Sequence, residues 1–157
     1  MRVLCLSCGR SGDGTGAGVD EANYRRDARG GRAALADCYA EDTVVETPDR
    51  GRFEGRSEVV KYLLSFSQAF PDANFESVSE LEDGNMAIDE GYFTGTHTRE
   101  MGLPAGEAIA PTGKQVHLRE CDVLVVEDGQ AVAHRFYWDQ LELIRQLGLE
   151  PGDEASG

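Results

Sequence analysis

Two tight turns constrain the fold of this chain more than any other feature of its sequence. Asp128-Gly129 separates two apolar-rich stretches, at about 115–126 and 131–138, and Asp-Gly is a strong signal for a two-residue β-hairpin. Asp83-Gly84-Asn85 joins two earlier stretches, at about 74–82 and 86–98. Strands joined by turns this short run antiparallel, so the second half of the chain predicts an antiparallel sheet.

The rest of the chain predicts helices that pack on this sheet. Residues 57–70 are the clearest helix, because apolar side chains recur there at helical spacing and Pro71 ends it. The other predicted elements are a helix from Asp20 to about Ala40 with a break near Gly30-Gly31, a short strand Thr43–Thr47 stopped by Pro48, and a last helix from Asp139 to Gly148.

This order of elements predicts a single α+β domain. We expect a curved antiparallel sheet, in the form of a cone-shaped barrel, with the N-terminal helices enclosing a pocket. Residues 1–18 are rich in glycine and predict a flexible lead-in, residues 19–150 form the domain, and residues 151–157 predict a flexible tail. Residues 99–114 predict a long loop of the functional or mobile kind.

The charge of the chain argues against several partners. The formal net charge is −14, and a field of that sign repels nucleic acid and anionic membrane surfaces. No apolar run approaches the ~20 residues needed to span a bilayer. Met1–Cys8 is too short and too weakly basic for a secretory signal, so we expect a cytoplasmic protein.

The four cysteines do not predict metal or redox chemistry. Cys5 and Cys8 form a C-x-x-C, but a structural zinc site needs a second close pair of ligands, which the sequence lacks. Cys38 and Cys121 stand among apolar residues and are expected to be buried thiols of a reducing compartment.

One glycine pattern resembles a nucleotide fingerprint. Gly12, Gly14 and Ala17 fit G-x-G-x-x-A after a short apolar run. That motif needs parallel βαβ units, whereas this chain predicts antiparallel hairpins, so we expect no bound dinucleotide.

The last hairpin gathers charged residues if its ladder is regular. With a two-residue turn, Tyr137 faces Glu120 and Arg135 faces Asp122, while Asp139 faces Leu118 on the same side. This face is then either a solvated surface with an ion pair or part of a pocket. The opposite face carries Trp138, Phe136 and His134 as core, and a single bulge would exchange part of this assignment.

An ordered set of short motifs runs through the chain. They are Ala69-Phe70-Pro71-Asp72, Gly95-Thr96-His97-Thr98, Pro111-Thr112-Gly113-Lys114, Asp128-Gly129, His134, Asp139-Gln140 and Gln146-Leu147-Gly148. Over about residues 20–149 this order resembles the SnoaL-like polyketide cyclases and the related ester cyclases, which have the nuclear transport factor 2-like fold. The resemblance is specific for fold and family, but this fold hosts enzymes and binding modules alike.

The resemblance implies a cyclase or isomerase that acts on a polyketide-like ester or ketone. Asp139 matches the family's catalytic aspartate, acid and base of an intramolecular aldol reaction that needs no metal or organic cofactor. His134 and His117 are expected to assist it. The expected pocket residues are His97, Glu120, Asp122, Tyr137 and Trp138. The expected partners are a small hydrophobic substrate and a second copy of the chain.

Two alternatives stay open. Asp139-Gln140-Leu141-Glu142 also reads as a capping box, which would make Asp139 a helix cap in a non-catalytic, small-molecule-binding homodimer. Epoxide hydrolysis would need two carboxylates bridged by Arg119 or Arg135. An Asp139 carboxylate that faces an enclosed cavity would favour an enzyme, and one that accepts from nearby amides in water would favour the cap.

Overall fold

The computed structural model describes residues 28–102 and 108–149. The helices are α1 Ala28–Asp37, α2 Arg56–Ala69 and α3 Gln140–Gln146. The strands are β1 Tyr39–Thr47, β2 Gly51–Glu54, β3 Asn74–Asp83, β4 Met86–Thr96, β5 Met101–Gly102, β6 Ala108–Ile109, β7 Gln115–Glu127 and β8 Gln130–Trp138.

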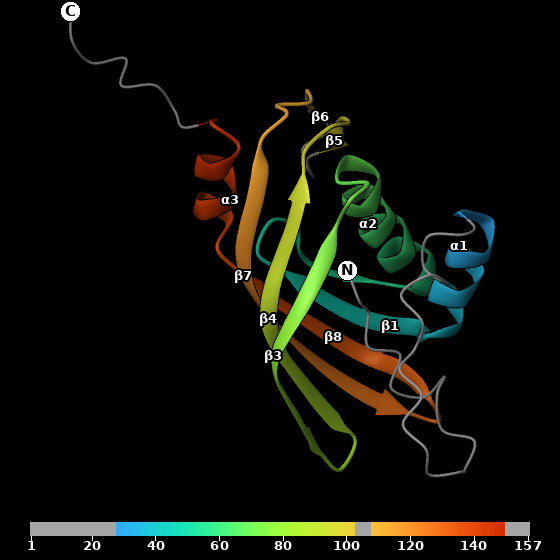
Figure 1. The fold of residues 1–157 in the computed structure, drawn as a ribbon. Helices are drawn as coiled ribbons and strands as arrows, with labels where there is room; N and C mark the ends of the chain where they lie inside the picture. The colour runs from blue at the N-terminus through green and yellow to red at the C-terminus, as the bar shows by residue number, and fades with distance from the viewer. Residues whose placement is uncertain (1–27, 103–107, 150–157) are drawn as a thin grey trace, which may run out of the picture.

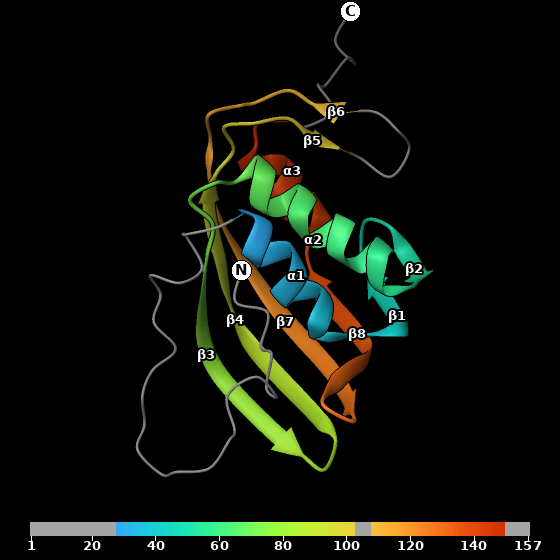
Figure 2. The ribbon, with the colours of Figure 1, turned by 90° about the vertical axis from the view of Figure 1, so that its right-hand side faces the viewer.

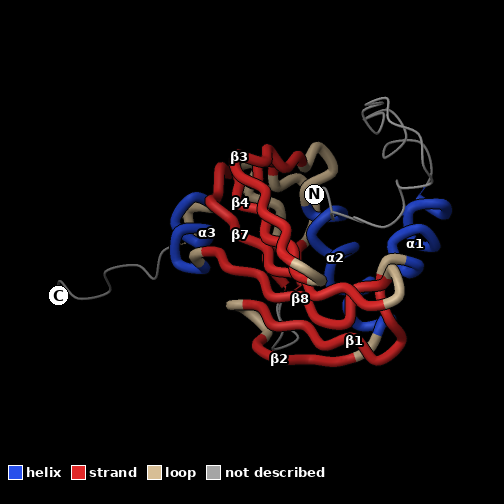
Figure 3. The backbone as a smooth tube through the Cα atoms, turned by 90° about the horizontal axis from the view of Figure 1, so that it is seen from below, coloured by secondary structure: helices blue, strands red, loops and turns tan. Residues whose placement is uncertain are grey.

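A curved sheet of six strands, in the order β2-β1-β8-β7-β4-β3, carries the fold. It curls around α2, which lies with α1 on its concave side, while α3 lies at its other side next to β7 (Figures 1 and 3). Neighbouring strands are antiparallel except β1 and β8, which pair in parallel. The predicted α+β architecture with a curved, largely antiparallel sheet is therefore confirmed.

Both predicted hairpins form. Asp83 pairs with Met86, and Glu127 pairs with Gln130, so each turn has two residues. Asp128 and Gly129 both have positive φ, 48° and 79°, as a type I′ turn requires.

The other elements differ from the prediction in several places. Helix α1 runs through Gly30 and Gly31 without the expected break and ends at Asp37, because β1 begins at Tyr39 rather than near Thr43. Strand β2 was not predicted. The expected loop 99–114 contains the two-residue strands β5 and β6, which pair with each other. The predicted lead-in, tail, C-x-x-C and glycine pattern lie outside the described residues.

Helix α3 docks on β7 through one side chain. Strand β8 ends opposite Glu120, so the first half of β7 has no strand on that side. The Gln146 amide takes its place: its Oε1 accepts from the backbone N–H of His117 at 2.6 Å, and its Nε2 donates to the His117 carbonyl at 3.0 Å. Leu147 is buried beneath, and Gly148 has a φ of 73°, which favours glycine after a helix.

Two apolar clusters fill the space between the sheet and α2. One gathers around Tyr62 and Phe136, and the other around Phe70 and Phe93. The rings of Phe66 and Trp138 meet edge to face at 6.1 Å and pack against both clusters, so this pair joins them. Figure 2 shows α2 lying across the sheet.

Close approach of strands explains one glycine. A Cβ on Gly91 of β4 would lie 2.2 Å from the Glu76 carbonyl oxygen of β3, so no larger residue fits without a backbone shift.

Two further predictions concern the cysteines and membrane-spanning segments. Cys38 and Cys121 are half-buried rather than buried, and the Cys38 thiol donates to the Ala34 carbonyl oxygen at 3.2 Å. None of the helices in the described parts of the chain is long and apolar enough to cross a membrane.

Candidate functional site

A bulge in the last hairpin decides which side chains share a face. Val125 pairs with Ala133 but Val126 pairs with Ala131, so Val132 is an extra residue on β8. Beyond it the register is shifted by one, and Glu120 faces Trp138. The regular ladder predicted from the sequence is therefore wrong.

The shift divides the predicted charged face in two. On the concave, helix-covered side of the sheet, which we call the inner face, Glu120 and Asp122 lie with His134, Phe136 and Trp138. Arg135, Tyr137 and Asp139 belong to the opposite side, the outer face.

The inner face buries three carboxyl groups. Glu120 and Asp122 of β7 are 6% and 8% exposed, and Asp89 of β4 is 2% exposed. Asp89 is the direct cross-strand neighbour of Asp122. Burial, and then the charge of Asp122, raises the pKa of Glu120 well above its usual range. Burial and the charge of Asp89 raise the pKa of Asp122 to about 8.

His134 completes this group. It is 1% exposed, and burial followed by the charge of Arg135 lowers its pKa to about 3. Its Nε2 lies 3.7 Å from Asp122 Oδ1. Because both groups are neutral near pH 7, this is a contact between two neutral groups rather than an ion pair. Neither atom has a hydrogen-bond partner in the structure.

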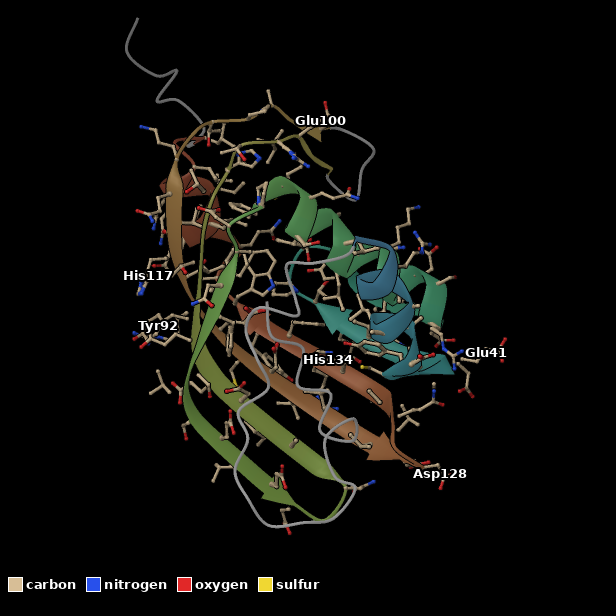
Figure 4. All side chains as sticks on the ribbon, turned by 45° about the vertical axis from the view of Figure 1, so that its right-hand side comes forward. Glu41, Tyr92, Glu100, His117, Asp128 and His134 are labelled. Carbon is tan, nitrogen blue, oxygen red and sulfur yellow. The ribbon has the colours of Figure 1, made fainter. Side chains whose placement is uncertain are left out.

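Two aromatic residues hold the imidazole in place. The Tyr39 hydroxyl lies 2.8 Å from His134 Nδ1, and the Phe136 ring stacks on the imidazole at 3.8 Å. If the hydroxyl donates to Nδ1, the His134 proton is on Nε2 and is directed at Asp122. Figure 4 shows His134 between the sheet and the helices.

A small cavity opens beside Glu120. It has room for about 20 Å³, enough for one water molecule. Its lining residues are Tyr62, Phe66, Phe93, Leu118, Glu120, Phe136, Trp138 and Leu143. Glu120 is the one carboxyl group among the residues that line this cavity.

The outer face carries a larger, open groove of about 1140 Å³ along β4, β7, β8 and α3. The rings of Tyr92 and His117 stack there at 4.5 Å, and Tyr137 is 54% exposed. Figure 4 shows Tyr92 and His117 together on the side of the sheet away from α1 and α2. His117 and Tyr137 are thus separated by the sheet from His134, with which the sequence grouped them.

Asp139 has the geometry of the cap. Its Oδ1 accepts from the backbone N–H groups of Leu141 at 2.9 Å and Glu142 at 3.0 Å, and the side chain is exposed. By the criterion set out from the sequence, this favours a cap for α3 over a carboxylate in a closed pocket.

His97 also lies apart from the inner-face group. It is buried at the end of β4, where its Nδ1 accepts from the backbone N–H of Thr112 at 3.2 Å and its ring lies 5.3 Å from that of Phe70. These contacts tie the loop after β4 to the segment before β7, and His97 does not line the small inner cavity.

The arginine bridge of an epoxide hydrolase does not form on the inner face. Arg119 alternates with Glu120 along β7 and is exposed, and Arg135 alternates with His134 on β8. Within residues 28–102 and 108–149, no group of three or more His, Cys, Asp or Glu side chains is placed to hold a metal ion.

Sequence reasoning missed Asp89 and Tyr39. Asp89 had a usable signal, because along β4 it alternates in step with Ala87 and Phe93, which are core residues. Tyr39 had none, since it lay within the predicted helix.

A family model described as SnoaL-like polyketide cyclase matches residues 24–147. A proposed SnoaL-like polyketide cyclase from Jannaschia sp. CCS1 superimposes with a TM-score of 0.69 at 17% identity, over 84% of this chain and 87% of that one. IdmH from Streptomyces antibioticus, a proposed polyketide cyclase, gives 0.63 at 20% identity, over 80% and 91%. AclR from Streptomyces galilaeus, a proposed hydroxylase, gives 0.63 at 24% identity, over 78% and 87%. A search of curated protein sequences finds no match.

Proposed function

The chain belongs to the SnoaL-like polyketide cyclase family, and from this membership we propose that it is a cofactor-independent enzyme of the cyclase or isomerase type. Its substrate is a polyketide-like ester or ketone, small and hydrophobic. The reaction is of the intramolecular aldol type, in which one carboxyl group acts as both acid and base.

The observation that carries this proposal is the position of Glu120. Its carboxyl group borders the aromatic cavity and is almost fully buried, and burial raises its pKa. A carboxylate with a raised pKa is a stronger base, and its acid form is populated near neutral pH. We therefore assign to Glu120 the role that the sequence resemblance gave to Asp139.

The proton cycle closes on Glu120. The carboxylate removes a proton from the carbon next to a carbonyl group, which gives an enolate. The enolate carbon then bonds to a second carbonyl carbon, and the electrons of that C=O bond move onto its oxygen. The protonated Glu120 returns the proton to this alkoxide, so the enzyme ends in its starting state.

Trp138 is the donor that we assign to the enolate oxygen. Apart from protonated Glu120, only Tyr62 and Trp138 among the described cavity residues have side-chain donors, and the Tyr62 hydroxyl donates to Asp49 Oδ1 at 2.9 Å. No residue in the described ranges accepts a hydrogen bond from the Trp138 indole N–H. A donor already in position stabilises developing charge without reorganisation.

Binding requires the cavity to enlarge. A volume of about 20 Å³ admits one water molecule and no ketone of polyketide size. Phe66 is half-buried and packs against both clusters, so rotation of its ring, with Trp138 left in place, is the simplest way to enlarge the cavity.

A non-catalytic binding module is the second candidate. The cap geometry of Asp139 favours it, because the residue matched to the family's acid and base is occupied by the helix amides. In that case the cavity would bind a hydrophobic ligand that Glu120 merely orients. Water activation on an epoxide has less support, since no described arginine bridges the inner carboxyls.

We also propose that a second copy of the chain covers the outer face. Tyr137 and Leu141 are exposed large apolar side chains beside the stacked Tyr92 and His117. Exposed apolar surface of this extent is costly in a monomer. Sedimentation at several concentrations tests this: a single monomeric species in every sample would contradict it.

The enzyme reading is tested with Glu120→Gln, which keeps the shape and hydrogen-bonding capacity of the side chain. Asp139→Asn is the matched control, because asparagine also caps a helix. The proteins are screened by thermal shift and turnover against aromatic polyketides, β-keto esters, steroids and terpene epoxides. We expect a ketone or ester ligand to stabilise all three proteins, with turnover lost in Glu120→Gln and kept in Asp139→Asn.

Other outcomes separate the candidates. Turnover lost only in Asp139→Asn would return the catalytic role to Asp139. Ligands that bind all three proteins without conversion would support the binding module. Turnover restricted to epoxides would support water activation.

A further inference from the structure

A partly buried hydrogen bond links the inner carboxyl groups to strand β3, away from the cavity. The Ser77 hydroxyl of β3 donates to Asp89 Oδ1 at 2.6 Å, and Asp89 is 2% exposed. A hydroxyl that donates to a carboxyl oxygen at this distance stabilises the ionised form of that carboxyl. The hydrogen bond from Ser77 therefore favours the ionised form of Asp89 on the inner face.

This anion faces the proposed catalytic strand. Asp89 pairs directly with Asp122, and side chains of such a cross-strand pair lie about 5 Å apart at Cβ. Glu120 lies two residues from Asp122 on the same face of β7. Within the described parts of the chain, the other titratable groups on this face are Glu80, the partner of Asp89 on β3, and His134 of β8, which lies against Asp122.

The Asp122 carboxyl group lacks a hydrogen bond that an ionised carboxylate would need. Its Oδ1 is buried without a hydrogen-bond partner and points toward the equally unpartnered Nε2 of His134. An ionised carboxylate would not be left unsatisfied in this position, whereas a protonated one is tolerated. A fixed charge on Asp89 explains why Asp122 keeps its proton.

We propose that Asp89, held by Ser77, is a positioning residue of the acid/base site, whose negative charge strengthens proton binding by the two β7 carboxyl groups, Asp122 and Glu120. The catalytic meaning of this proposal rests on the proposed role of Glu120. The effect of the Asp89 charge on the protonation of Asp122 and Glu120 does not depend on that role. Asp89 touches neither the cavity nor a substrate and acts only through its charge.

The test is a pH titration of the Asp and Glu side-chain carboxyl carbons by NMR, from pH 5 to 10. The variants are Asp89→Asn and Ser77→Ala. The controls are Glu90→Gln, which removes the same charge from the next residue of β4 on the outer face, and Ser79→Ala, an exposed serine of β3. We expect the two highest carboxyl midpoints of the wild-type protein to fall by on the order of one pH unit in Asp89→Asn, and by less in Ser77→Ala.

The controls should leave those midpoints unchanged. An equal fall in Glu90→Gln, or no fall in either Asp89→Asn or Ser77→Ala, would overturn the proposal. If Asp89→Asn does not fold, Ser77→Ala alone decides, because it keeps the carboxyl group and removes only the donor.

A kinetic readout links the inference to catalysis. With a substrate found by the screen above, the acid-to-base midpoint of kcat/KM should move with the NMR midpoint in Asp89→Asn. A shift by NMR with no substrate turned over would sustain the charge effect and reject the catalytic role of Glu120. If Glu120→Gln abolishes turnover but the midpoints do not move in Asp89→Asn or Ser77→Ala, the catalytic role of Glu120 stands and the charge effect of Asp89 is rejected.

Discussion

Asp122→Asn should make the protein more stable in mildly alkaline solution. Asparagine keeps the shape of the side chain and cannot ionise. Burial, with the charge of Asp89, raises the pKa of Asp122 from 3.8 to about 8 in the folded protein. The folded state therefore keeps a proton that the unfolded state releases, and stability falls as the pH rises through this interval.

His134 acts in the opposite direction. Burial lowers its pKa from 6.5 to about 3, so the unfolded state binds a proton that the folded state refuses. This contribution to stability is complete above pH 6.5 and is lost as the pH falls toward 3. Between pH 4 and pH 6.5 the two groups roughly cancel, and above pH 6.5 only Asp122 remains.

The fall in the free energy of unfolding above pH 6.5 comes from the one proton that Asp122 keeps in the folded state. One proton is worth about 1.4 kcal/mol per pH unit, and each group is half titrated at one end of the interval, so the free energy of unfolding should fall by about 1–2 kcal/mol from pH 6.5 to pH 8. Asp122→Asn should remove this part of the fall. Glu120, whose pKa burial also raises, adds to the slope in both proteins.

Urea unfolding at pH 5.5, 6.5, 7.5 and 8.5 measures the free energy of unfolding of the wild-type protein and of Asp122→Asn. The probe is the fluorescence of Trp138, the single tryptophan. Glu90→Gln is the control, because it removes a carboxyl group from the outer face. If the stability of the wild-type protein falls no more steeply above pH 6.5 than that of Asp122→Asn, Asp122 is ionised there and the reasoning fails.

Three further changes test the framework around the site. Asp139→Ala should lower the free energy of unfolding by about 1 kcal/mol through loss of the α3 cap, while Asp139→Asn changes it little, as urea titrations would show. Gln146→Ala removes both hydrogen bonds to the His117 backbone and should cost about 1–3 kcal/mol, again by urea, with faster amide exchange at His117. Gly91→Ala should lower stability by more than about 3 kcal/mol, seen as a lower Tm or as unfolded protein, because its Cβ meets the Glu76 carbonyl oxygen.

Local chemistry made much of the fold predictable. Asp128-Gly129 specifies its own turn, and the apolar stripe of 57–70 specifies α2, since both depend on neighbours in sequence. The parallel pairing of β1 with β8 depends on residues almost ninety positions apart, for which short motifs carry no signal.

The site was less predictable than the fold because of one residue. Val132 adds no unusual composition to β8, yet its bulge moves Glu120 from the side of Tyr137 to the side of Trp138. Alternation is reliable within a strand and unreliable across a bulge. For the same reason Asp89, placed by the regular part of β4, was within reach of sequence reasoning.

The amide of Gln146 also bears on how this chain avoids association. Half of β7 would offer a free row of backbone donors and acceptors where β8 stops, and open strand edges of this kind template aggregation. One glutamine side chain, carried by a helix of two turns, occupies that edge at its centre. Loss of α3 by proteolysis would uncover it, so a clipped chain should be prone to fibre formation even where the rest of the sheet stays folded.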